Sequence, residues 1–254
     1  MGPRSRWRIR MAQGASLAAV VAVWAAVVNA RLFPGDIVPS PAAVAGRIVG
    51  LALSADFYGH LRVTAAEIAG GLALAAVAGI LLGVAIGARP LLRRAYEPWL
   101  HYLAPTPKIV FFPVMLMLFG VGAASKVSLA TLGAFFPIVL GTISGVREMD
   151  PVLVQVGRGF ALSPYRMLTM VYVPAIRAAL VNAVRLGFGV AVVVVLLAET
   201  KLSSAGIGYL IIDAYRHFDM PLLAALVLVL FGLAILANAG LARLARHGAP
   251  AVSR

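Results

Sequence analysis

The sequence predicts an all-α membrane protein that crosses the bilayer about six times. Composition is the first observation: 62% of the 254 residues are apolar and only 12% are charged, against roughly 45–50% and 25% in soluble domains. Second, several stretches without charge approach the roughly 20 residues that a helix needs to cross the hydrocarbon core. Third, Lys and Arg lie between these stretches, so the net charge of +13 indicates membrane topology. We therefore expect no nucleic-acid partner.

The apolar stretches define the spans in chain order. We expect transmembrane helices over residues 11–30, 68–88, 109–125, 127–146, 178–198 and 220–242. The third contains Pro113 and comes after Pro105 and Pro107, so its start is poorly defined. The fifth is long enough only if Arg185, near one end, extends its side chain to the headgroups.

The distribution of the cations predicts the orientation, because Lys and Arg accumulate in cytoplasmic loops. With six spans, the side that holds both termini carries 16 of the 22 Lys and Arg residues, Lys108 among them. The other side carries the remaining six, including Lys126. Both termini are therefore expected to be cytoplasmic.

The segments around the spans give the expected domain organisation. These segments are a basic N-terminus (1–10), an outer loop (31–60), the main transmembrane domain (61–244) and a cytoplasmic tail (245–254). In the outer loop, Ser40 and Pro41 predict the start of a short interfacial helix that runs to about Leu53. The basic start, the apolar run and Val28-Asn29-Ala30 also resemble a cleaved secretory signal. Because the run exceeds the 7–15 residues of a signal core, we expect the first helix to be retained.

The second span carries a small residue at every fourth position. The stripe consists of Gly71, Ala75, Gly79, Gly83 and Gly87. In a bilayer, close contact of backbones over small residues is one way in which helices associate. The stripe therefore predicts contact with another helix, either in this chain or in a second copy.

The cytoplasmic loop between the fourth and fifth spans has its own helical pattern. Asp150-Pro151 and Ser163-Pro164 are two helix starts, and Pro174 interrupts or ends the helix that begins at the second of them. We expect two short helices, over about 151–162 and 164–173, that meet at a corner. Leu153, Val156 and Phe160 give the first helix an apolar stripe, which either lies on the membrane or docks into another protein.

This loop also has the spacing of a known signature, E-A-A, three residues, G, nine residues, I-x-L-P. The matching residues are Gln155-Val156-Gly157, Ala161 and Val171-Tyr172-Val173-Pro174. Further blocks occur in the same order along the chain, among them Val38-Pro39-Ser40-Pro41, Phe119-Gly120-Val121-Gly122, Ala198-Glu199 and Ser204-Ala205-Gly206-Ile207-Gly208-Tyr209. From about residue 32 to 246 the chain resembles the permease subunits of bacterial ABC importers, in particular the nitrate/sulfonate/taurine branch. Gln155, Ala161 and Val173 stand where that family usually has Glu, Gly and Leu.

The resemblance implies a type I ABC importer permease fold and a role for segment 150–174 as the element that couples to a cytoplasmic ABC ATPase. The residues it implies for this contact are Leu153, Gln155, Val156, Gly157, Phe160, Ala161, Val171, Val173 and Pro174. It further implies a second permease copy, expected as a homodimer, an extracytoplasmic solute-binding protein and a bacterial inner-membrane location. The solute would be small, similar to nitrate, sulfonates, taurine or thiamine precursors.

The lysines exclude one way of binding ATP. A phosphate-binding loop needs Gly-Lys followed by Ser or Thr. The three lysines of this chain come directly after Pro107, Ser125 and Thr200. We therefore expect ATP hydrolysis on a separate subunit, and no catalytic residue, cofactor or metal on this one.

Two other function classes have less support in the sequence. Against an intramembrane enzyme, no two of His60, His101, His217 and His247 have metal-ligand spacing on one helix. Glu199 and Asn182 are candidate pore-facing or span-end residues, and helix pairing explains them as well. A secondary transporter or channel-like subunit without an ATPase is the alternative, although mid-membrane ionisable residues or inverted repeats are expected of that class.

Overall fold

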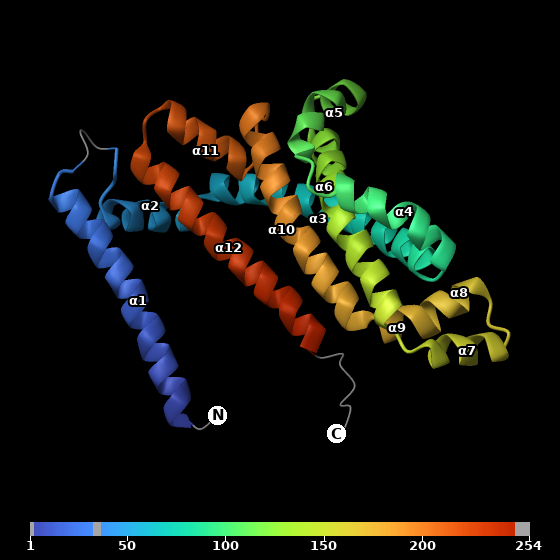
Figure 1. Ribbon diagram of the computed structural model, residues 1–254. Helices are drawn as coiled ribbons and strands as arrows, with labels where there is room; N and C mark the ends of the chain where they lie inside the picture. Colours follow the sequence, from blue (N-terminus) through green and yellow to red (C-terminus); the bar gives the residue numbers. More distant parts are fainter. Residues whose placement is uncertain (1–2, 33–36, 247–254) are drawn as a thin grey trace. The chain divides into compact units, whose positions relative to one another are not determined.

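The computed structural model describes residues 3–32 and 37–246, and every regular element in these ranges is helical (Figure 1). The chain divides into two compact units, one of residues 1–58 with 210–230 and one of residues 59–209 with 231–254. Most of the expected tail over 245–254, with His247, lies outside the described residues. In chain order the elements are α1 (Pro3–Asn29), α2 (Pro41–Leu53), α3 (Ala55–Gly87), α4 (Pro90–Leu103), the 3₁₀ turn η1 (Lys108–Phe111), α5 (Phe112–Phe119), α6 (Ala123–Glu148), α7 (Pro151–Gly159), α8 (Pro164–Arg166), the π-helix η2 (Met167–Tyr172), α9 (Val173–Ala175), α10 (Arg177–Lys201), α11 (Ile207–Arg216) and α12 (Met220–Arg246).

Among the described residues, five helices are long and apolar enough to cross a membrane, and they confirm five of the six predicted spans. They run over Trp7–Asn29, Ala55–Gly87, Ala123–Glu148, Arg177–Lys201 and Met220–Arg243. In the first unit, the Ser40 hydroxyl accepts a hydrogen bond from the Ala43 N–H at 3.2 Å. The helix that this cap begins is the predicted one, because α2 starts at Pro41 and ends at Leu53.

The third span differs from the prediction over 109–125. In its place α4 and the η1–α5 segment form a pair bent by 86°, and α5 alone, at eight residues, is only about 12 Å long. The helix cannot continue to residue 125, because Gly120 ends α5 at φ +74°, a conformation that glycine adopts without steric cost. A new helix, α6, then begins at Ala123.

Lys108 holds the bend in place and is not a solvated loop cation. Its Nζ donates hydrogen bonds to the carbonyls of Leu103, Ala104 and Thr106 at 2.6–2.8 Å. The carbonyls of Leu103 and Ala104 lie at the end of α4, where a helix lacks internal donors, and that of Thr106 lies in the turn that follows. The ammonium also lies 4.3 Å from the centre of the Phe136 ring, and the residue is 8% exposed.

The core of the second unit forms where α3 and α10 pack on α6, and α6 and α10 lie side by side (Figure 1). Buried Ala75, Ala134 and Ala191 keep these backbones close. The four stripe glycines are Gly71, Gly79, Gly83 and Gly87. A Cβ added at any of them would lie 2.5–2.9 Å from an α6 side chain. The stripe therefore packs inside this chain, which was one of its two predicted partners.

Candidate functional site

The segment after α6 begins its two helices where the sequence predicts. Asp150 caps α7, accepting a hydrogen bond from the Val152 N–H at 2.9 Å, and Pro151 occupies the first position. Ser163 caps α8 in the same way, with the Arg166 N–H at 3.4 Å and Pro164 first. Because each cap satisfies a backbone donor that the helix leaves free, both starts are set by the local sequence.

The corner between them is a Schellman turn, and it shortens α7. The helix ends at Gly159 and not near 162. The Ala161 N–H donates to the Arg158 carbonyl at 2.9 Å and the Leu162 N–H to the Gly157 carbonyl at 3.2 Å, which is the hydrogen-bond pair of this motif. The motif places Ala161 in the left-handed region, at φ +48°. Glycine is favoured at such a position, which gives a physical reason for the Gly of the signature.

The second helix is not a regular α-helix over 164–173, as was expected. After one turn of α8 the chain widens into the π-helix η2, and a last turn, α9, contains Pro174. Proline has no N–H to donate to the preceding turn, and its ring clashes with the carbonyl four residues earlier. The wider turns of η2 stand directly before this proline and relieve that clash.

Gly157 lets α7 lie against η2. The residue is buried, and a Cβ there would lie 2.5 Å from Met167 Sδ and 3.1 Å from Val171 Cγ2. Beside this contact is an open, largely apolar groove of about 480 Å³. Six of the predicted coupling residues line it: Leu153, Val156, Gly157, Phe160, Val171 and Pro174.

The apolar stripe of α7 is exposed in this chain. Leu153 is 44%, Val156 51% and Phe160 78% exposed. Such a patch outside the spans is typical of a surface that another molecule covers. The groove and the stripe together are the candidate functional site.

Three predicted coupling residues lie elsewhere. Gln155 faces a separate hollow that Arg93, Arg147 and Arg158 also line. Val173 packs against the buried cluster of the second unit, and Ala161 forms the corner. None of the three lines the groove.

The two candidate pore residues have different surroundings. Glu199, in the last turn of α10, is 1% exposed. Its carboxylate accepts hydrogen bonds from the Thr64 hydroxyl at 2.7 Å and from the Gly208 N–H at 2.6 Å. This burial favours the span-end role over a pore-facing one. Asn182 is exposed on α10, and its side chain has no hydrogen bond within the described ranges.

One buried ion pair was not predicted from the sequence. Lys126 Nζ lies 3.0 Å from Glu67 Oε1, and both side chains are almost fully buried. Lys126 was expected on the outer side of the membrane, as an ordinary loop cation. In the sequence the two residues are visible only as charges beside apolar runs, which does not predict that they pair. In the structure α3 begins at Ala55, and Glu67 therefore lies well inside the helix.

The chain also matches a known protein family. Residues 75–254 match the model of the family described as "Binding-protein-dependent transport system inner membrane component". The chain belongs to this family. The match covers more than two thirds of the sequence and includes the whole coupling segment.

Curated relatives of this permease share most of its length. It is 30% identical to the putative aliphatic sulfonates transport permease protein SsuC of Bacillus subtilis, over 80% of this chain and 73% of that protein. It is 25% identical to the taurine transport system permease protein TauC of Escherichia coli, over 97% and 94% of the two chains. The predicted resemblance to the sulfonate/taurine branch is thereby confirmed.

Solved structures give the same fold. A chain of the MetNI methionine ABC transporter in an inward-facing conformation superposes with a TM-score of 0.61, at 18% identity, over 76% of this chain and 94% of that one. The permease therefore has the fold of type I ABC importer membrane subunits. It is a permease subunit of an ABC importer, and the alternative of a transporter without an ATPase is not favoured.

Proposed function

We propose that this permease works with a separate cytoplasmic ABC ATPase and that the groove beside α7 is where the ATPase binds. One observation carries the proposal. Leu153, Val156 and Phe160 expose an apolar stripe on a segment outside the candidate spans, at the end of α6 and next to α10. A partner that moves α7 would also move these two helices, because the segment connects them directly.

The local structure is suited to transmitting such a movement. Caps at Asp150 and Ser163 and the Schellman turn at Ala161 fix both helices and the corner. The contact of Gly157 with Met167 and Val171 joins α7 to η2 without a gap. A well-packed corner of this kind deforms little when a partner presses on it.

The same proposal includes the other subunits. A second copy of the chain would complete the transmembrane gate as a homodimer, and an extracytoplasmic binding protein would deliver the solute across the bacterial inner membrane. The names of the relatives support an organic sulfonate or taurine as the solute. In this scheme residues 61–244 form the transmembrane domain and 150–174 its coupling segment.

Reconstitution tests the proposal. Proteoliposomes are prepared with the permease and a cognate ABC ATPase. A binding protein and radiolabelled taurine or an alkanesulfonate are added outside. We expect uptake that requires both ATP and the ATPase. Equal uptake by the permease alone would contradict the proposal.

A further inference from the structure

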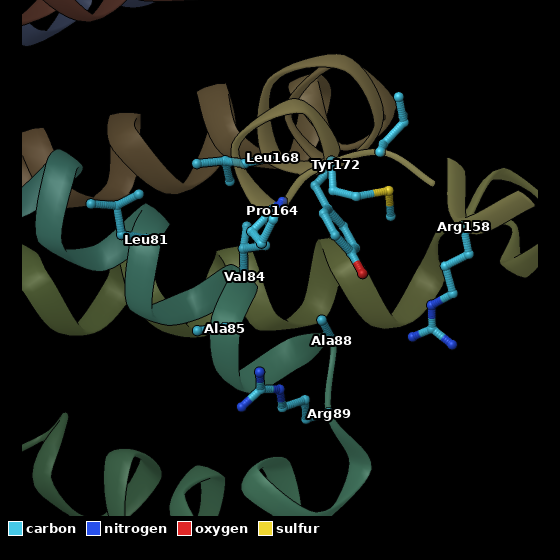
Figure 2. A pocket seen from close by; sticks show the side chains of 11 residues that line it. Leu81, Val84, Ala85, Ala88, Arg89, Arg158, Pro164, Leu168 and Tyr172 are labelled. Atoms are coloured by element: carbon cyan, nitrogen blue, oxygen red, sulfur yellow. The ribbon is translucent and has the colours of Figure 1, made fainter. Parts of the chain in front are cut away.

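A second pocket lies on the other side of the coupling segment, between the end of α3 and the helices α7, α8 and η2. Its volume is about 470 Å³ (Figure 2). It is distinct from the α7 groove: Leu162 borders both, but the α3 residues line only this one of the two. All of its lining residues belong to the second unit.

One side of the pocket holds hydrogen-bond donors without partners. Arg89 and Arg158 are exposed, and neither guanidinium has an ion pair or hydrogen bond to any residue that the structure describes. Arg89 precedes Pro90 at the start of α4, and its side chain caps nothing there. Two unopposed cations at one pocket favour an anionic ligand.

The Tyr172 side chain is the second observation that points to a ligand. The residue is only 8% exposed, and its hydroxyl has no hydrogen-bond partner in the described part of the chain. Figure 2 shows the ring pointing toward Ala88, with the hydroxyl directed to the side on which both guanidinium groups lie. The hydroxyl is accessible from the pocket that the residue lines, and an anion between the two arginines would accept its hydrogen bond.

The neighbouring arginines, unlike Arg89 and Arg158, have an acidic partner. Arg93 and Arg147 line the adjoining hollow, but both are within 4.0 Å of Glu97. Glu97 therefore offsets part of their charge. Arg89 and Arg158 have no such acidic partner among the described residues. Arg158 and Tyr172 border both hollows, whereas Arg89 lines only the pocket between α3 and η2, which locates the anion site there.

The opposite wall of the pocket is apolar. Leu81, Val84, Ala85 and Leu168 form it (Figure 2), and Leu81 is 50% exposed. The α3 residues among them belong to the end of a candidate span that the cation distribution places at the cytoplasmic surface. A ligand that fills both halves must combine an anionic group with a hydrocarbon chain.

We propose that this pocket binds an anionic phospholipid of the cytoplasmic leaflet. Its phosphate lies between Arg89 and Arg158 and accepts a hydrogen bond from the Tyr172 hydroxyl, and an acyl chain lies along Leu81 and Leu168. Basic pockets at the cytoplasmic side of transmembrane helices attract such lipids. A free inorganic anion would leave the apolar wall uncovered. This proposal rests on the cytoplasmic location of the end of α3 and not on the proposed binding of the ATPase.

Native mass spectrometry of the purified, delipidated permease tests this site. The protein is titrated with phosphatidylglycerol and, separately, with phosphatidylcholine of the same acyl chains. We expect a preference for phosphatidylglycerol that weakens about fivefold for each of Arg89→Gln and Arg158→Gln, and about 25-fold for both. Tyr172→Phe should weaken binding less than either arginine variant. Arg94→Gln, an exposed α4 cation that does not line the pocket, should have no effect.

Each of three results would overturn the proposal. Equal binding of the two lipids would show that the charge is not recognised. An Arg94→Gln effect as large as that of Arg89→Gln would show general attraction to a basic surface. Displacement of phosphatidylglycerol by equimolar inorganic phosphate would assign the site to a soluble anion. The arginines are exposed, so the single variants should fold, which circular dichroism checks.

Discussion

Lys126 on α6 and Glu67 on α3 form an ion pair of 3.0 Å in which the side chains are only 6% and 2% exposed. The pair joins two helices that otherwise meet over small residues, because the stripe of α3 faces the same helix. Because both side chains are buried, replacing one partner leaves the other as an unpaired buried charge. Replacing both leaves neither member of the pair as an unpaired charge.

Lys126→Met should therefore destabilise the permease by about 3–5 kcal/mol. The double variant Glu67→Gln, Lys126→Met should recover most of this loss. Thermal unfolding in detergent measures both, with Lys201→Met, at an exposed cation, as the control. Single and double variants of equal stability would show that the pair is not coupled.

Ala161→Gly should stabilise the corner between α7 and α8. An L-residue in the left-handed region costs roughly 1–2 kcal/mol, and the greater freedom of glycine in the unfolded chain returns about 0.4–1 kcal/mol of that. The net gain should be about 0.5–1 kcal/mol by these two terms, visible as slower amide exchange at Leu162. The matched change Ala178→Gly, in the helix α10, should have the opposite sign, and a loss at both positions would contradict the left-handed conformation of Ala161.

Gly83→Ala should push α3 away from α6. Its Cβ would lie 2.5 Å from Thr142 Cβ and 3.0 Å from the Val139 carbonyl oxygen, and overpacking of this kind costs about 1–3 kcal/mol. Gly59→Ala, in the same helix with nothing within 4 Å, should be neutral or stabilising by up to ~1 kcal/mol. Thermal unfolding separates the two. Equal effects would mean that the stripe does not pack as described.

Much of the fold can be predicted from the sequence, because a span is set by local composition. The five uniform apolar runs form long helices. The run over 109–125 does not, because its end depends on the positive φ of Gly120 and its start on how Lys108 bonds to the end of α4. Neither the backbone angle nor that hydrogen bonding is readable from hydropathy.

In the candidate site, too, the features set by local sequence were predictable and those set by backbone conformation or packing were not. Its helix starts were predictable, since Asp150-Pro151 and Ser163-Pro164 act within one turn. The end of α7 was not, because Ala161 adopts a conformation in which alanine is uncommon. The Glu67–Lys126 pair and the phospholipid pocket were not predictable either, since both depend on how distant segments align when they pack.

The central claim is that the exposed stripe of α7 binds the ATPase, and co-purification tests it most directly. The tagged permease is expressed with a cognate ABC ATPase, as the wild type, as Phe160→Asp and as Val152→Asp. Val152 is the matched control, because it is 55% exposed on the same helix but does not line the groove. We predict that all three permeases reach the membrane in equal amounts and that only Phe160→Asp loses the ATPase. An unchanged complex with Phe160→Asp, or an equal loss with Val152→Asp, would contradict the claim.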